Sequence, residues 1–122
     1  MEPYIDGFVV PVPRDRLDEY KRVAEAAAEI WKEHGAMEYW ECVGDDLRIE
    51  GTSSFLDLAN ISDDETVLFS WAVFPSKQVR DRANEAIASD PRMAEIMDPQ
   101  NTPFDMQRTI WGGFRTLVRA TP

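Results

Sequence analysis

The stretch TVLFSWAVF, residues 66–74, is apolar on both of the faces that a strand would present. Side chains alternate between the two faces of a strand. This alternation places Val67, Phe69, Trp71 and Val73 on one side and Leu68, Ser70, Ala72 and Phe74 on the other. Strands that are buried on both faces read as continuous hydrophobic runs of this kind. We therefore expect a central strand that is covered on both sides.

Helical periodicity flanks this strand. Before it, apolar residues recur at three- and four-residue steps, which is typical of an amphipathic helix, and Gly35 marks the helix end because glycine accepts the left-handed conformation. After it, two Asp-Pro steps act as helix boundaries, since aspartate caps a helix and proline fits its first turn. We expect a long helix between Asp15 and His34, a second from Ser76 to Asp90 and a short one at 91–97.

Three further stretches have the composition of strands, which is aromatic and β-branched. They are residues 4–12, which end in prolines, residues 36–43 and residues 107–119. In the last of these, Gly112-Gly113 permits a bulge or the close approach of another group. Residues 47–65 have little periodicity apart from one short helix expected within 53–59, and residues 100–105 read as a loop.

The order of these elements predicts the fold class. Strand, helix, strand, strand, helix, short helix and strand match an α+β, ferredoxin-like split βαβ arrangement, with four antiparallel strands and both main helices on one face. We expect one domain over residues 1–122, because this length is common for a single core. Two helices cover only one face of the sheet, so we expect the other face to pair with a second copy in a homodimer.

Composition excludes several classes of function. The formal net charge is −10, and the basic side chains lie among acidic ones, so nucleic acid is not an expected partner. One cysteine and one histidine cannot assemble a thiolate-rich metal site, and we predict no metal and no cofactor. No stretch approaches the roughly 20 apolar residues that cross a bilayer, and the N-terminus lacks a signal pattern, so we predict a cytoplasmic protein with no membrane partner.

Five runs of sequence carry a family resemblance. They are residues 5–46, residues 64–76 (DETVLFSWAVFPS), residues 90–99 (DPRMAEIMDP), residues 101–105 (NTPFD) and residues 111–114 (WGGF). Together they resemble the YbaA-like family of uncharacterised bacterial proteins, a domain of unknown function, over nearly the whole chain; residues 47–51 depart from it. The resemblance implies the dimeric α/β barrel superfamily, in which two ferredoxin-like sheets close face to face, and it implies no established activity.

Two residues are candidates for catalysis. His34 is the single histidine, and its ordinary pKa lies near neutrality, so it suits proton transfer. It also falls in the last turn of the predicted helix, where the helix dipole alone favours a histidine. Asp6 interrupts an apolar strand, which indicates either a carboxylate that faces an enclosed space or a solvated strand edge.

Five residues are candidates for ligand binding. Tryptophan offers a wide apolar surface with one hydrogen-bond donor, although core packing explains many tryptophans equally well. Glu41 and Arg115 break apolar runs, and with Asp6 they would form a polar cluster if the three met across the sheet. The predicted ligand-binding set is Trp31, Glu41, Trp71, Trp111 and Arg115.

Three functions follow as alternatives. The first is a homodimer that binds a small apolar or aromatic molecule in its barrel. The second, suggested by the family resemblance, is an enzyme similar to the cofactor-independent monooxygenases, with His34 or Asp6 as the base and Trp31 or Trp71 beside the substrate. The third is a purely structural or regulatory homodimer. The sequence does not decide whether the protein is an enzyme.

Overall fold

The computed structural model of the chain describes residues 2–100 and 102–122. Met1, in the predicted domain 1–122, and Asn101, in the predicted loop 100–105, lie outside the described residues. The strands are β1 (Tyr4–Pro13), β2 (Glu38–Val43), β3 (Glu65–Phe74) and β4 (Ile110–Arg115). The helices are α1 (Leu17–Glu33), α2 (Phe55–Leu58), α3 (Lys77–Ala88) and α4 (Pro91–Ile96), with single 3-10 turns at Arg14–Arg16 and Met106–Arg108.

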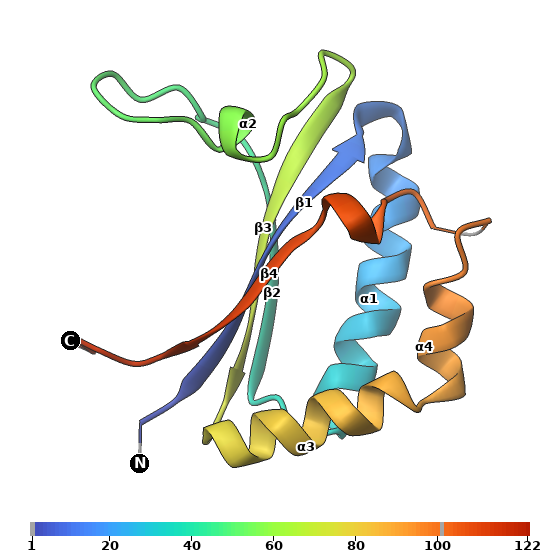
Figure 1. Ribbon diagram of the computed structural model, residues 1–122, viewed down its shortest axis with the longest axis vertical. Coiled ribbons are helices and arrows are strands. Elements are labelled where there is room, and N and C mark those ends of the chain that lie inside the picture. Colours follow the sequence, from blue (N-terminus) through green and yellow to red (C-terminus); the bar gives the residue numbers. More distant parts are fainter. Residues whose placement is uncertain (1, 101) are drawn as a thin grey trace.

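The four strands form one antiparallel sheet in the order β2-β3-β1-β4. Helices α1, α3 and α4 all lie on one side of this sheet, while α2 lies on the other (Figure 1). The α+β, split βαβ arrangement expected from the order of elements is therefore confirmed.

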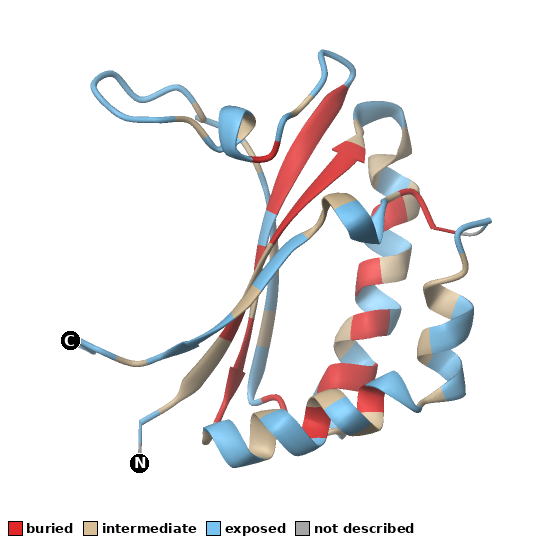
Figure 2. Cartoon of the chain, in the orientation of Figure 1, coloured by how far each residue is buried: buried red, intermediate tan, exposed pale blue. Residues whose placement is uncertain are grey.

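Strand β3 is an interior strand of the sheet, and its side chains alternate between the two faces as predicted. Leu68, Ala72 and Phe74 point towards the helices and are buried there in the hydrophobic core with residues of α1 such as Ile30. Figure 2 shows the buried positions of α1 turned towards the sheet. On the opposite face, which we call the open face, Phe69 keeps 47% of its surface exposed.

Strand β1 continues beyond its expected end. Pairing with β3 runs to Pro13, opposite Glu65, although prolines were expected to close the strand near Val12. Proline lacks an N–H and is tolerated only where no ladder partner is lost. Pairing of β1 with β4 ends at Val9, so Pro11 has a strand neighbour on one side only.

The helix ends follow the predicted chemistry. His34 is the C-terminal cap of α1, and Gly35 has φ +122°, the conformation that favours glycine. The Ser76 hydroxyl accepts a hydrogen bond from the amide of Val79 at the start of α3. The Asp90 carboxylate accepts one from the amide of Arg92 at the start of α4, where Pro91 occupies the first turn.

Strand β4 is shorter than expected and carries no bulge. Residues 106–108 form a 3-10 turn capped by Asp105, and pairing with β1 ends at Arg115 because its partner Tyr4 begins that strand. The register is continuous through Gly112-Gly113, so the bulge interpretation is wrong. The close-approach interpretation holds at Gly113, where a Cβ atom would lie 2.6 Å from the hydroxyl oxygen of Tyr4.

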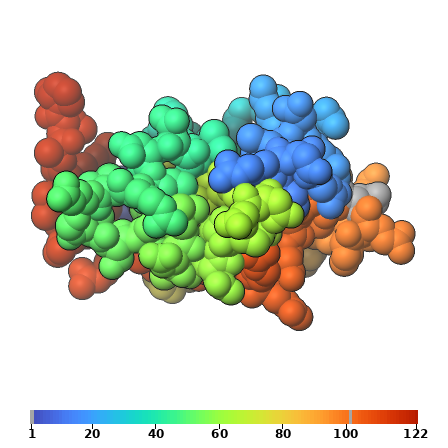
Figure 3. All heavy atoms as spheres, turned by 90° about the horizontal axis from the view of Figure 1, so that it is seen from above, coloured from blue at the N-terminus to red at the C-terminus, as the bar shows by residue number. Residues whose placement is uncertain are grey.

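Two segments border the open face. The excursion between β2 and β3 packs Ala59 against Val9 and Val67 at one end of the sheet. The C-terminal segment projects past the sheet, with Leu117 exposed. Figures 1 and 3 show the excursion and the C-terminal segment on the side of the molecule away from α4. Between them, the middle of the open face is covered by no other described segment.

Candidate functional site

A cavity of about 340 Å³ lies between the sheet and helices α1, α3 and α4, and it opens to the solvent. This volume falls in the range of roughly 300–1,000 Å³ that is usual for small-molecule sites. Its walls are mainly apolar. The larger side chains that line it are Phe8, Tyr20, Trp31, Tyr39, Met93, Met97, Phe104, Met106 and Trp111.

Four aromatic rings, three from the sheet and one from α1, form a continuous row in the wall of this cavity. The ring centroids of Tyr39 and Trp31 are 5.9 Å apart, those of Trp31 and Phe8 are 5.7 Å apart, and Phe8 stacks on Trp111 at 5.5 Å. These spacings are typical of favourable aromatic pairs. Trp31 and Trp111, both predicted as ligand-binding residues, thus line one cavity with an aromatic surface.

Glu41 supplies the charge in this cavity and accepts hydrogen bonds from three hydroxyl groups. Its Oε1 atom accepts from the hydroxyls of Tyr20 at 2.8 Å and Ser70 at 2.5 Å, and its Oε2 atom accepts from Tyr39 at 2.7 Å. The donors come from α1, β3 and β2, so the carboxylate joins the helix layer to two strands. We call these four residues the Glu41 cluster.

Both tyrosines of the Glu41 cluster are held in their protonated, donating form. Burial raises the pKa of Tyr20 well above its ordinary value, and the neighbouring negative charge of Glu41 raises it further. The same two causes, in the same order, raise the pKa of Tyr39. The two hydroxyls therefore stay donors to Glu41 at any pH near neutrality.

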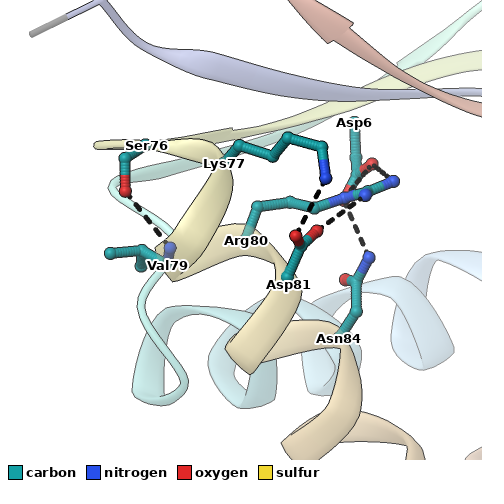
Figure 4. Close-up of polar contacts among 7 residues, drawn as sticks. All are labelled: Asp6, Ser76, Lys77, Val79, Arg80, Asp81 and Asn84. Atoms are coloured by element: carbon teal, nitrogen blue, oxygen red, sulfur yellow. Dashed lines mark hydrogen bonds and ion pairs between the residues drawn. The ribbon is translucent and has the colours of Figure 1, made fainter.

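Asp6 belongs to a separate buried network beside the cavity (Figure 4). Its side chain is fully buried and pairs with Arg80 of α3, whose Nη2 lies 2.9 Å from Asp6 Oδ1. The side-chain amide of Asn84 donates to Asp6 Oδ2 at 3.4 Å. A carboxylate of this kind only accepts, so this bond turns the amide nitrogen of Asn84 to Asp6 and its Oδ1 atom away.

That Asn84 Oδ1 atom is buried and accepts no hydrogen bond from any other described residue. Asn84 also lines the cavity. Buried acceptors in folded proteins nearly always have a partner, so an orphan of this kind calls for an explanation.

His34 lies outside the cavity walls and joins two helices. Its Nε2 atom is 3.0 Å from Asp90 Oδ2, which ties the end of α1 to the start of α4. Hydrogen bonds from Arg92, and then from His34, hold the pKa of Asp90 well below its usual range. The position of His34 in the last helical turn, noted from the sequence, is thus used for a contact between helices.

The polar cluster of Asp6, Glu41 and Arg115 that the sequence left open does not form. Glu41 and Arg115 lie on β2 and β4, the two opposite edges of the sheet. Asp6 pairs with Arg80 instead. Arg115 is exposed at the end of β4 and is not among the described residues that line the cavity.

Trp71 lies on the open face rather than in the cavity. It stacks on Trp40 of β2 with ring centroids 5.5 Å apart and contacts the ring of Phe69 at 5.6 Å. Of the predicted ligand-binding set, Trp31, Glu41 and Trp111 therefore share one cavity, and Trp71 and Arg115 do not.

A second groove of about 410 Å³ lies between α1 and β2, on the outer side of the Glu41 cluster. Tyr20, Tyr39 and Glu41 line both spaces, so they form a partition between groove and cavity. The charged residues along this groove are Asp18, Lys21, Glu25 and Glu41.

Sequence reasoning missed Tyr20, Tyr39, Ser70 and Asn84. One signal was available, because Ser70 is a polar residue within the otherwise apolar strand 66–74.

Within residues 2–100 and 102–122, no group of three or more His, Cys, Asp and Glu side chains could hold a metal ion. No helix in the same ranges is long and apolar enough to cross a membrane.

The sheet order and the cavity define a ferredoxin-like α+β domain with a ligand-sized space beneath its helices. The chain belongs to the family described as "Protein of unknown function (DUF1428)", which matches residues 3–106. It is 43% identical over 115 residues to "Uncharacterized protein YbaA" of Escherichia coli (strain K12), covering 94% of this chain and 97% of that protein. The protein of the same name in Shigella flexneri is equally similar. The predicted family resemblance is confirmed.

Solved structures share the fold at low sequence identity. A nipsnap family protein with unknown function from Agrobacterium tumefaciens matches with a TM-score of 0.60 and 14% identity, covering 99% of this chain and 93% of that one. An uncharacterized NIPSNAP domain protein from Burkholderia xenovorans matches with a TM-score of 0.56 and 12% identity, covering 96% and 94%. These likenesses support the fold class alone.

Proposed function

We propose that this protein binds a small apolar or aromatic molecule in the cavity between its sheet and helices, and that it works as a homodimer joined through the open face. The cavity carries the first half of the proposal. It combines an aromatic row, several flexible methionines and the Glu41 carboxylate in one space of ligand size. Mostly apolar walls with a few placed polar groups are the usual composition of small-molecule sites.

The open face supports the second half. Trp40, Phe69 and Phe114 each expose about half or more of their surface on it, and large apolar patches on a monomer commonly mark an interaction surface. Among the strand residues that point this way, only Glu38 and Glu65 carry charge, and both begin their strands. In a chain with net charge −10, this face can therefore meet its own copy across a twofold axis with little like-charge repulsion.

Binding is a better proposal than oxygenation by the residues named from the sequence. A catalytic base must lie within hydrogen-bond reach of its substrate. His34 contacts Asp90, and Asp6 contacts Arg80, and neither is among the described residues that line the cavity. For this reason we assign them structural contacts and leave turnover out of the proposal.

A thermal-shift screen with a panel of aromatic and aliphatic metabolites tests ligand binding. A molecule that binds only the folded state at 100 times its Kd adds about 2.7 kcal/mol to stability, which raises Tm by about 10 °C for a chain of this length. Because Ala94 lines the cavity and is exposed, Ala94→Phe should fill the space and abolish the shift.

The matched control is Ala26→Phe, at an exposed position of α1 that is not among the described cavity residues. It should leave the ligand shift unchanged. A folded wild-type protein that gives no shift with any compound of the panel would contradict the binding proposal.

A further inference from the structure

Glu41 is the only charged side chain among the described residues that line the cavity. Its three hydrogen-bond partners there are the neutral hydroxyls of Tyr20, Tyr39 and Ser70. Glu41 is partly buried, and a carboxylate that loses part of its water is commonly paired with a cation. The cavity thus presents a negative charge whose contacts within the described chain include no counter-ion.

The unused hydrogen-bonding capacity of the cavity is also of the accepting kind. A carboxylate offers about four acceptor positions, and three of those on Glu41 are occupied, which leaves one free. Asn84 Oδ1 is a second buried acceptor without a donor among the described residues. Because the bond from Asn84 to Asp6 fixes the amide orientation, this acceptor is a feature of the fold.

The surroundings favour a positive charge as well. Tyr39 and Trp31, whose ring centroids are 5.9 Å apart, line the same cavity as Glu41, and aromatic ring faces attract cations. The groove outside the Glu41 cluster carries Asp18 and Glu25 beside the single Lys21. A net charge of −10 adds a field that draws cations and repels anions.

We propose that the molecule bound in the cavity is an organic amine, whose ammonium group pairs with Glu41 while its apolar body lies along the aromatic row. This inference rests on the proposed binding function and specifies the ligand class. An ammonium supplies both the missing counter-ion and an N–H donor for the free acceptor position of Glu41. A carboxylic acid of the same shape brings a second negative charge to Glu41, and an alcohol supplies a donor without the charge.

Three probes of one shape separate these cases: 2-phenylethylamine, 2-phenylethanol and 3-phenylpropionate, each titrated calorimetrically into the wild-type protein at pH 7. The amine should bind at least tenfold more tightly than the alcohol, and the carboxylate should bind most weakly. Glu41→Gln keeps the side-chain size and an accepting oxygen but removes the charge. It should weaken amine binding at least tenfold and bring the amine level with the alcohol.

The matched control is Glu38→Gln, the same change at an exposed position on the same strand, facing away from the cavity. It should leave all three affinities unchanged. Alcohol or carboxylate binding as tight as amine binding in the wild-type protein would overturn the amine inference while leaving the binding function intact. That comparison needs no variant, so it holds even if Glu41→Gln folds poorly. A metabolite panel in which nothing binds would instead remove the binding function itself.

Discussion

The two faces of the sheet differ in the kind of interaction that their side chains lack within the chain. On the helix-covered face, Ser70 at the centre of β3 lines a cavity that also contains the charged group of Glu41. On the open face, the same strand carries Phe69 and Trp71, which stack into an aromatic surface with Trp40. The covered face contains a cavity whose charged group, Glu41, has no counter-ion among the described residues. The open face carries apolar side chains that no described segment covers.

This difference indicates two kinds of partner. A space with a few directed polar groups selects a small molecule by chemistry, because each polar atom demands a matching one. A broad apolar surface selects by area and shape, because burial of apolar area is non-directional. The predictions below test each face separately, beginning with the change of largest expected effect.

Asp6→Ala should disrupt the covered face most. It leaves the Arg80 guanidinium, whose side chain is only 19% exposed, without its buried partner, and breaking a buried ion pair costs about 3–5 kcal/mol. Urea denaturation measures the loss in unfolding free energy. Asp81→Ala removes a second, exposed carboxylate from the same guanidinium and should cost much less. Equal effects of the two changes would show that the Asp6 pair is not a buried one.

Phe69→Asp should prevent dimerisation through the open face. A charge within the apolar open face should raise the dimer dissociation constant at least 100-fold, about 2.8 kcal/mol. Sedimentation velocity at micromolar concentration should show a dimer for the wild-type protein and a monomer for the variant. Glu85→Gln, an exposed change on α3, should leave the dimer unaffected. A wild-type protein that sediments as a single chain would refute the pairing of open faces.

Lowering the pH should have the smallest effect on stability, through Glu65 at the edge of the open face. The guanidinium of Arg108, together with contacts from Ser62, lowers the pKa of Glu65 to about 2 from an ordinary 4.5. A carboxyl group with a lowered pKa in the fold stabilises the protein above pH 4.5 and loses that contribution as pH falls towards 2. The pair is partly exposed, so the contribution should be about 1 kcal/mol or less.

Unfolding free energies at pH 6 and pH 3 measure this effect. The decrease between the two should be smaller in Glu65→Gln than in the wild-type protein. Glu50→Gln, an exposed change in the excursion, should leave the decrease as it is. An identical decrease in all three proteins would mean that Glu65 titrates as it does in the unfolded chain.

The fold could be predicted because each local signal agrees with the final structure. Residues 66–74 are apolar on both faces, and they form strand β3, with one face packed against the helices and the other forming the open face. Gly35 and Asp90 stand where α1 ends and α4 begins. The ends of β1 and β4 were harder to predict from the sequence, because they depend on how far neighbouring strands overlap, which is a tertiary property.

The site was harder to predict because it depends on register. Glu41 was singled out as a charge in an apolar run, but its partners Tyr20 and Ser70 are 21 and 29 residues away in sequence. Tyr20 reads as one more apolar position of a helix, and only the packing of α1 on β2 turns its hydroxyl towards Glu41. Trp71 was misplaced for the same reason, since the sequence does not say which face of β3 the helices cover.

The place of β1 in the sheet has a consequence for biosynthesis. Strand β1 lies between β3 and β4, and its β4 partners follow about a hundred residues later in the chain, a separation that slows folding. While the chain is being made, one long edge of β1 has no neighbour, and unpaired edges invite aggregation. The sheet therefore lacks its β4 edge until translation has delivered residues 110–115.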